Sequence, residues 1–225
     1  MDSLEQLRIE ISDCRRCPRL VEWREQVATE KRASFREWTY WGRPVPGFGD
    51  PAATILVLGL APAAHGANRT GRLFTGDRSG DWLFRAMHRA GFANQPGSDD
   101  VDDGLVLTRA WISAAVRCAP PANKPTPEER ETCRPFLDRE IALLGQLQAI
   151  VVLGQFAYDV AARHLVMTAR PKFGHGVEAS AVTTNGRPVT VLCSFHPSQQ
   201  NTFTGRLTEP MIDAVFERAR DLGIR

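Results

Sequence analysis

The sequence predicts a three-layer α/β/α fold with a central sheet of four, mainly parallel strands. Four short apolar runs carry this prediction, at residues 55–58, 105–116, 150–153 and 189–195. Helical patterns lie between them, and such alternation is typical of a parallel sheet covered on both faces. At 225 residues and 43% hydrophobic, the chain can bury one full core. We therefore expect a single domain over residues 1–225.

Each element has its own signal in the sequence. Two helices are expected at the amino terminus, because apolar residues recur there at helical spacing, and an irregular segment rich in aromatic residues, prolines and glycines follows them. Asp77 and Ser79 can begin a helix after the first strand, and Thr126 with Pro127 begins another. The expected helices cover residues 2–13, 19–33, 127–147, about 155–164 and 208–222, with one more after Asp77; residues 94–104 and 165–187 are expected as loops, the latter with room for a hairpin.

The loop at residues 59–77 carries most of the chemistry. Its glycines allow sharp turns and close approach to a ligand, and it is longer than a connection that serves no function usually is. Polar loops also follow two other strands, at residues 117–126 and 196–207. Because the carboxyl ends of parallel strands share one edge of a sheet, we expect Asp77, Asn123 and His196 to line one cleft.

The cysteines suggest a metal centre. Cys14 and Cys17 form a C-x2-C pair, while Cys118 at a strand end and Cys133 in the next helix can return to the same place. A zinc ribbon normally has two such pairs, whereas ligation of an iron–sulfur cluster tolerates scattered spacing. Spacing alone leaves three alternatives open: an iron–sulfur cluster, zinc, or free thiols. Cys193 lies inside an apolar strand and is expected to be an ordinary buried residue.

Composition limits the setting of the protein. No signal-peptide core and no run of membrane-spanning length is present, so we expect a cytoplasmic protein that contacts no membrane. The net charge of +2 does not by itself indicate nucleic-acid binding. The absence of a G-x4-G-K-[ST] motif disfavours nucleotide hydrolysis.

Four features together resemble a known family, the family 5 (type B) uracil-DNA glycosylases, which carry a [4Fe-4S] cluster. They are GLAPAAHGANRTGRLFTGD, the C-x2-C pair with Cys118 and Cys133, VRCAPPANKPTPEE and HPSQQNTFTGRLT. The resemblance covers residues 14–206. It implies that Cys14, Cys17, Cys118 and Cys133 bind the cluster. It also implies a monofunctional glycosylase, which hydrolyses the bond between uracil or another damaged base and the sugar of DNA.

The resemblance assigns roles to individual residues. Asp77 would be the catalytic carboxylate, with Asn123 and His196 beside it, and Phe74 would stack on the extruded base. The remaining contacts to the base are expected from Gly59, Ala63, Ala64 and Ala114. Other branches of the superfamily have polar residues in place of Ala63 or Ala64 and of Ala114, which implies a more open pocket here. Contacts to the DNA backbone are expected from Arg69, Arg72, Asn201, Thr202 and Arg206.

One function of a different class fits the same residues. A nucleic-acid-binding module could use a metal centre to hold basic loops in place without breaking a bond. The resemblance favours the enzyme. It implies DNA with uracil or other deaminated bases as the partner. We also expect a monomer, although the sequence indicates neither an oligomeric state nor a protein partner.

Overall fold

The centre of the computed structural model, which describes residues 2–223, is a mixed β-sheet. Within those residues the sheet has seven strands in the order β1-β3-β2-β4-β7-β6-β5. Strands β3, β2, β4 and β7 are parallel neighbours, whereas β1, β6 and β5 pair antiparallel at the two ends. The strands are β1 (Phe48–Gly49), β2 (Ile55–Gly59), β3 (Ala110–Ala114), β4 (Ala149–Leu153), β5 (Leu165–Met167), β6 (Glu178–Thr183) and β7 (Pro188–Ser194).

The expected α/β class is confirmed, but the expected number of four strands is too low. The four strands predicted from apolar runs are the parallel ones, and every residue of β2, β3 and β4 is buried. The additional strands lack such runs, because β1 has two residues, β5 has three and β6 alternates exposed with buried residues. The expected strand at 105–116 is also shorter, since the regular pairing covers only Ala110–Ala114.

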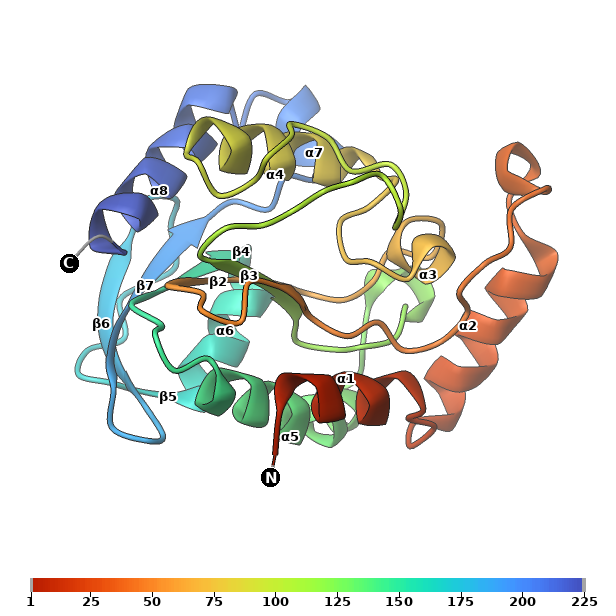
Figure 1. Ribbon diagram of the computed structural model, residues 1–225, viewed down its shortest axis with the longest axis horizontal. Coiled ribbons are helices and arrows are strands. Elements are labelled where there is room, and N and C mark those ends of the chain that lie inside the picture. Colours follow the sequence, from red (N-terminus) through yellow and green to blue (C-terminus); the bar gives the residue numbers. More distant parts are fainter. Residues whose placement is uncertain (1, 224–225) are drawn as a thin grey trace.

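Helices cover both faces of the sheet, which gives the three layers that the sequence predicts (Figure 1). Helices α4 and α8 lie on one face and α1, α5 and α6 on the other, while α2 lies at one end of the molecule (Figure 1). The helices are α1 (Leu4–Ser12), α2 (Pro18–Glu30), η1 (Ala33–Phe35), α3 (Ala67–Thr70), α4 (Arg78–Arg89), η2 (Pro121–Asn123), α5 (Pro127–Leu143), α6 (Gln155–His164), α7 (Gln199–Phe203) and α8 (Glu209–Leu222).

Two apolar cores hold the layers together. The first joins α4 and α8 to the sheet and includes Phe84, Met87 and Phe216. The second joins α5 and α6 to the opposite face and includes Ile141 and Tyr158. Cys193 belongs to this second core, as expected for an ordinary buried residue. The sheet is therefore fixed from both sides, and its carboxyl edge is a rigid base for the loops.

The helix starts follow the capping residues that the sequence indicates. Asp77 is the N-cap of α4, and its side chain accepts a hydrogen bond from the backbone N–H of Gly80. Thr126 and Glu129 form a reciprocal capping box at the start of α5. The short helix α7 lies in a segment that was expected to be a loop, and Ser198 caps it.

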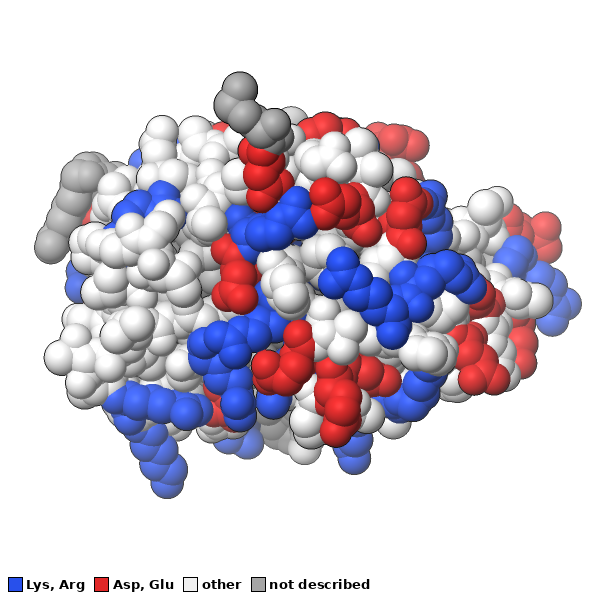
Figure 2. Space-filling view, turned by 90° about the horizontal axis from the view of Figure 1, so that it is seen from below, with Lys and Arg blue, Asp and Glu red and all other residues white. Residues whose placement is uncertain are grey.

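The face formed by α1 and α5 carries charges of both signs side by side, without a large basic area (Figure 2). Arg139 of α5, for example, pairs with Asp2 and with Glu10 of α1. This face therefore lacks the excess positive charge that binds a phosphate backbone. No helix within residues 2–223 combines the length and the apolar character needed to cross a bilayer.

Candidate active site

A cavity of about 450 Å³ opens at the carboxyl edge of the parallel strands. The loops after β2, β3 and β7 all contribute to its wall, so segments far apart in the sequence meet there, as predicted. Ligands of open α/β sheets bind at this edge. The lining residues are Leu60, Ala61, Ala63, Leu73, Phe74, Asp77, Ser79, Asn123, His196, Ser198, Gln199 and Gln200.

Asp77 enters the cavity from the N-terminus of α4. Its Oδ1 accepts a hydrogen bond of 3.0 Å from the backbone N–H of Gly80. Burial raises the pKa of the Asp77 carboxyl above its usual 3.8, while hydrogen bonds from the backbone of Gly80 and Ser79 act in the opposite direction. The helix N-terminus thus stabilises the carboxylate, and poor solvation makes it a better proton acceptor than an exposed aspartate.

Close backbone packing shapes the surroundings of Asp77. A Cβ atom on Gly66 would lie 2.4 Å from Oδ2 of Asp77, and one on Gly80 would lie 1.8 Å from the carbonyl oxygen of Phe74. A Cβ atom on Gly59 would lie 2.8 Å from Cζ of Phe74. A Cβ atom at any of these three positions would therefore force Asp77 or Phe74 to move. Phe74 itself has φ of 56°, a left-handed conformation that is uncommon for such a bulky residue and is found most often at functional sites.

His196 faces the same cavity from the loop after β7. Its ring centroid lies 6.3 Å from that of Phe74. Burial lowers the pKa of His196 from 6.5 to about 4, so its imidazole is neutral at pH 7. The Nδ2 of Asn201 donates a hydrogen bond of 2.8 Å to the carbonyl oxygen of His196. The preceding N–H, that of Phe195, donates to Nδ1 of His175.

The other residues expected near the base lie at different depths. Asn123 is exposed, lines the cavity and has φ of 55°. Ala63 also lines the cavity, whereas Ala64 does not. Ala114 is 1% exposed and packs in the first apolar core, so it is outside the cavity wall.

The side chains of Arg69 and Arg72 are turned inward, which differs from the phosphate contacts that the sequence predicts. Arg69 is 3% exposed and lies over the rings of Phe35 and Trp38. Arg72 is 8% exposed and pairs with Asp103 at 2.6 Å. Both guanidinium groups are therefore engaged inside the protein, where they hold the loop at residues 59–77 in place.

Asn201 and Thr202 lie in α7 and mainly support the loop of His196. Asn201 binds the carbonyl oxygen of His196, and Oγ1 of Thr202 donates to the carbonyl oxygen of Ser198 at 3.2 Å. Arg206 is exposed and lies over the ring of Phe195 at 4.6 Å. Among the three arginines expected to contact the DNA backbone, Arg206 is thus the one with an exposed side chain.

Two further exposed cations lie near the cavity mouth and were not among the predicted site residues. Arg78 follows Asp77 directly and lies 4.3 Å over the ring of Phe203, a side chain that is 66% exposed. Lys124 follows Asn123. Neither forms an ion pair with any group in residues 2–223. The sequence signal that could have identified these two cations is their position directly after Asp77 and Asn123.

Three of the four cysteines expected to bind a cluster pack together, and Cys14 is near enough to raise the pKa of each of the other three thiols. Cys118 and Cys133 are buried, and both pack with Leu20 and Cys17. Burial, followed by the neighbouring Cys133 and Cys14, raises the pKa of the Cys17 thiol to about 11. Within residues 2–223, however, no three His, Cys, Asp or Glu side chains are arranged to hold a metal ion.

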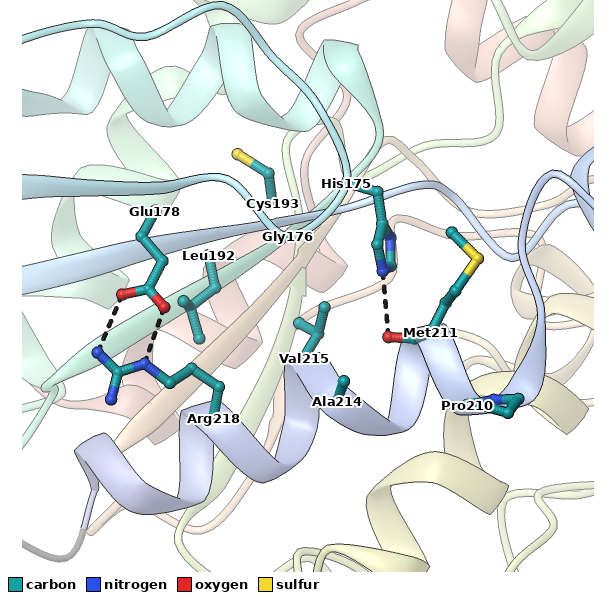
Figure 3. Close-up of a pocket in the computed structure, with 10 residues that line it drawn as sticks. All are labelled: His175, Gly176, Glu178, Leu192, Cys193, Pro210, Met211, Ala214, Val215 and Arg218. Carbon is teal, nitrogen blue, oxygen red and sulfur yellow. Dashed lines mark hydrogen bonds and ion pairs between the residues drawn. The ribbon is translucent and has the colours of Figure 1, made fainter.

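A second cavity, of about 490 Å³, lies between α8 and the strands β6 and β7 (Figure 3). An ion pair between Glu178 and Arg218 borders it, and His175 donates from Nε2 to the carbonyl oxygen of Met211. The thiol of Cys193 points away from this cavity (Figure 3). Its lining is largely apolar and contains none of the predicted site residues, so the chemistry lies in the first cavity.

A carboxylate, a neutral imidazole, an amide and an aromatic face around one cavity define an α/β enzyme that binds a flat, polar ligand. Residues 46–220 match the model of a protein family described as "Uracil DNA glycosylase superfamily". Three relatives are each named "Type-5 uracil-DNA glycosylase". The protein of Mycobacterium bovis is 56% identical over 223 residues, which are 98% of this chain and 82% of that protein. The protein of Mycobacterium leprae is 52% identical over 223 residues, 98% of this chain and 96% of that one.

The third relative, from Thermus thermophilus, is 50% identical over 214 residues, which cover 94% of each chain. The chain therefore belongs to the uracil-DNA glycosylase superfamily and, within it, to the type-5 group. This confirms the family that the sequence motifs indicate.

Replacing Gly66 by Ala should displace the Asp77 carboxylate, because the new Cβ would overlap Oδ2. A shift of about 1 Å at a reacting group can cost about 100-fold in rate. We expect kcat to fall by roughly 10- to 100-fold with little change in KM. Gly97→Ala is the matched control, since nothing lies within 4 Å of its added Cβ. Equal rates for both variants would contradict the close packing described here.

Desolvation of the half-buried His196 should make the fold less stable in acid. Its pKa is about 4 in the folded protein and 6.5 when unfolded, so between these values the unfolded chain binds more protons. The free energy of unfolding should therefore decrease as pH falls from 6.5 to 4, by up to about 3 kcal/mol from this residue.

Urea unfolding at several pH values tests this expectation against His196→Asn, which should show a shallower decrease. The raised pKa of Asp77 has the opposite sign and acts against this loss, so the comparison with the variant isolates the contribution of His196. An identical pH dependence in both proteins would show that His196 is not desolvated.

Proposed function

We propose that this protein is a monofunctional uracil-DNA glycosylase of base excision repair. It would hydrolyse the N-glycosidic bond of uracil, and of other deaminated or damaged bases, and leave an abasic site in DNA. The observation that carries the proposal is that a desolvated Asp77 and a neutral His196 line the same cavity, in a chain of this family.

The cavity suits a base that has been rotated out of the helix. Extrusion of a nucleotide costs a few kcal/mol and is easiest at mismatched or damaged pairs. The Phe74 ring offers a face for stacking, because Gly80 packs closely against its backbone and Gly59 against the edge of its ring. A preformed stacking face reduces the ordering needed on binding.

Bond breakage would develop charge at two ends of the cavity. The electron pair of the bond between C1′ and the base nitrogen leaves with the base, and the sugar takes on positive charge. The Asp77 carboxylate would stabilise this cation, orient a water molecule for attack on C1′ and accept its proton. A neutral His196 can donate a hydrogen bond to the oxygen on which the leaving base gathers negative charge.

Exposed cations around the mouth would bind the DNA backbone. Arg78, Lys124 and Arg206 are the candidates, because each is exposed and lies beside a loop that lines the cavity. Phosphate contacts of this kind fix the position of the duplex without reading its sequence.

We further propose that Cys14, Cys17, Cys118 and Cys133 bind a [4Fe-4S] cluster. Four cysteines with scattered spacing suit such a cluster, and the buried guanidinium of Arg24 next to Cys118 suits an anionic one. The cluster would serve as a covalent cross-link between the N-terminal segment, the loop after β3 and α5. In the proposed reaction, Asp77, His196 and a water molecule act on the substrate, and the cluster has a structural role.

Asp77→Asn should bind uracil-containing DNA with unchanged affinity and release uracil at least about 100-fold more slowly, because Asn can cap α4 but cannot accept the proton. Asp81→Asn, an exposed carboxylate in the first turn of the same helix, is the matched control. If Asp77→Asn released uracil at the wild-type rate, Asp77 would not be the catalytic carboxylate. Failure of the wild type to release any base would favour the non-catalytic binding module.

Protein prepared without oxygen should contain about four iron and four sulfide ions per chain and show the visible absorbance of an iron–sulfur cluster. Cys118→Ser and Cys133→Ser should lose both. Cys193→Ser should retain them, because Cys193 lies in a different core. Zinc in place of iron, or retention of iron by all three variants, would refute the assignment.

A further inference from the structure

Arg24 is a buried cation that points at a cysteine. It lies in α2, and its side chain is 2% exposed. Its Nη1 donates to Sγ of Cys118 at 3.0 Å and to the carbonyl oxygen of Cys14 at 3.2 Å. Glu25, its ion-pair partner, is 3.7 Å from Nη2 and has a side chain that is 44% exposed.

A guanidinium group in this position requires a strong anionic partner. Burial of an unpaired charge is costly, and a carbonyl, a neutral thiol and a distant, hydrated carboxylate compensate only part of that cost. A metal-bound cysteine is a thiolate and would supply the missing negative charge at the sulfur atom that Arg24 already contacts.

The backbone of the same residue contacts the active-site loop. The carbonyl oxygen of Arg24 accepts a hydrogen bond of 3.1 Å from Nδ2 of Asn68, a residue of α3 that is 0% exposed. The carbonyl oxygen of Asn68 in turn accepts a hydrogen bond from the N–H of Gly42. Two residues before Asn68, Gly66 lies against the Asp77 carboxylate.

We propose that Arg24 is a positioning residue that joins the cysteine centre to the active site. Its guanidinium holds the Cys118 thiolate, and its carbonyl oxygen, through Asn68, holds the segment that packs on Asp77. The proposal rests on the glycosylase function and on the cluster proposed above. It assigns the cluster a role in setting the position of Asp77 through α2, in addition to cross-linking the chain.

The test compares four variants of the full chain, prepared without oxygen. Arg24→Gln removes the charge, Arg24→Lys keeps the charge but loses the planar fork, and Asn68→Ala removes only the contact with the loop. Arg218→Gln is the control, because Arg218 of α8 forms an exposed ion pair with Glu178 and α8 lies at the other end of the molecule from α2 (Figure 1). The measurements are iron and sulfide content, the lifetime of the visible absorbance in air, melting temperature, and kcat and KM for uracil release.

Residues that contact metal ligands typically contribute about 10- to 100-fold to metal affinity or activity. We expect Arg24→Gln to shorten the lifetime of the absorbance by about 10-fold or more, and Arg24→Lys to be intermediate. Asn68→Ala should keep the wild-type iron content and lifetime while kcat falls about 10-fold and KM changes less than about twofold. If Arg24→Gln does not fold, Arg24→Lys and Asn68→Ala still decide the question.

The control Arg218→Gln should keep the wild-type lifetime of the absorbance. The same lifetime in Arg24→Gln, or in Arg24→Lys, would overturn the contact with the thiolate. A wild-type kcat in Asn68→Ala would overturn the connection to Asp77. Wild-type protein without iron and sulfide would overturn the inference together with the cluster. Wild-type protein that has the cluster but releases no base would remove the proposed function and the Asn68 half, while the lifetimes still decide the role of Arg24.

Discussion

The active-site loop depends on one packing constraint, which is that its backbone passes too close to Asp77 and Phe74 for any side chain to intervene. Gly59, Gly66 and Gly80 mark the three places where this happens. Contact of this kind limits the solvation of the Asp77 carboxylate on the side of Gly66 and leaves little room for the Phe74 ring to move toward Gly59. Gly80 packs against the backbone of Phe74, whereas Gly59 and Gly66 pack against the side chains of Phe74 and Asp77. Both side chains are thus held in place in the structure without a ligand, which is the kind of preorganisation that favours catalysis.

Desolvation shifts the pKa values of the two titratable side chains that line the cavity, Asp77 and His196. At Asp77, burial and the helix N-terminus act in opposite directions, and burial is the larger effect on its pKa. At His196, burial acts without an opposing carboxylate, so the ring stays neutral. A carboxylate able to take a proton and an imidazole able to donate a hydrogen bond are thus produced by desolvation, which is a recurrent way to separate acid and base roles within one site.

The parts of this structure that follow from local rules could be predicted from the sequence. The apolar run of β2, the capping role of Asp77 and the convergence of three loops are of this kind. The inward direction of Arg69 and Arg72 could not be predicted, because their partners include Phe35 and Asp103, which are distant in the chain. Ala114 illustrates the same limit, since whether a residue at a strand end faces a cavity or a core depends on register with its neighbours.

The cavity lies at the parallel part of the sheet, away from the antiparallel strands at its β5 end. Loops after β2, β3 and β7 form the cavity, while β5 and β6 extend the sheet beyond β7 as an antiparallel pair whose outer strand has only three residues. Val166 on that strand is 69% exposed, and so short an edge offers little template for pairing with another chain. Changes confined to this hairpin should therefore leave the residues that line the cavity in place.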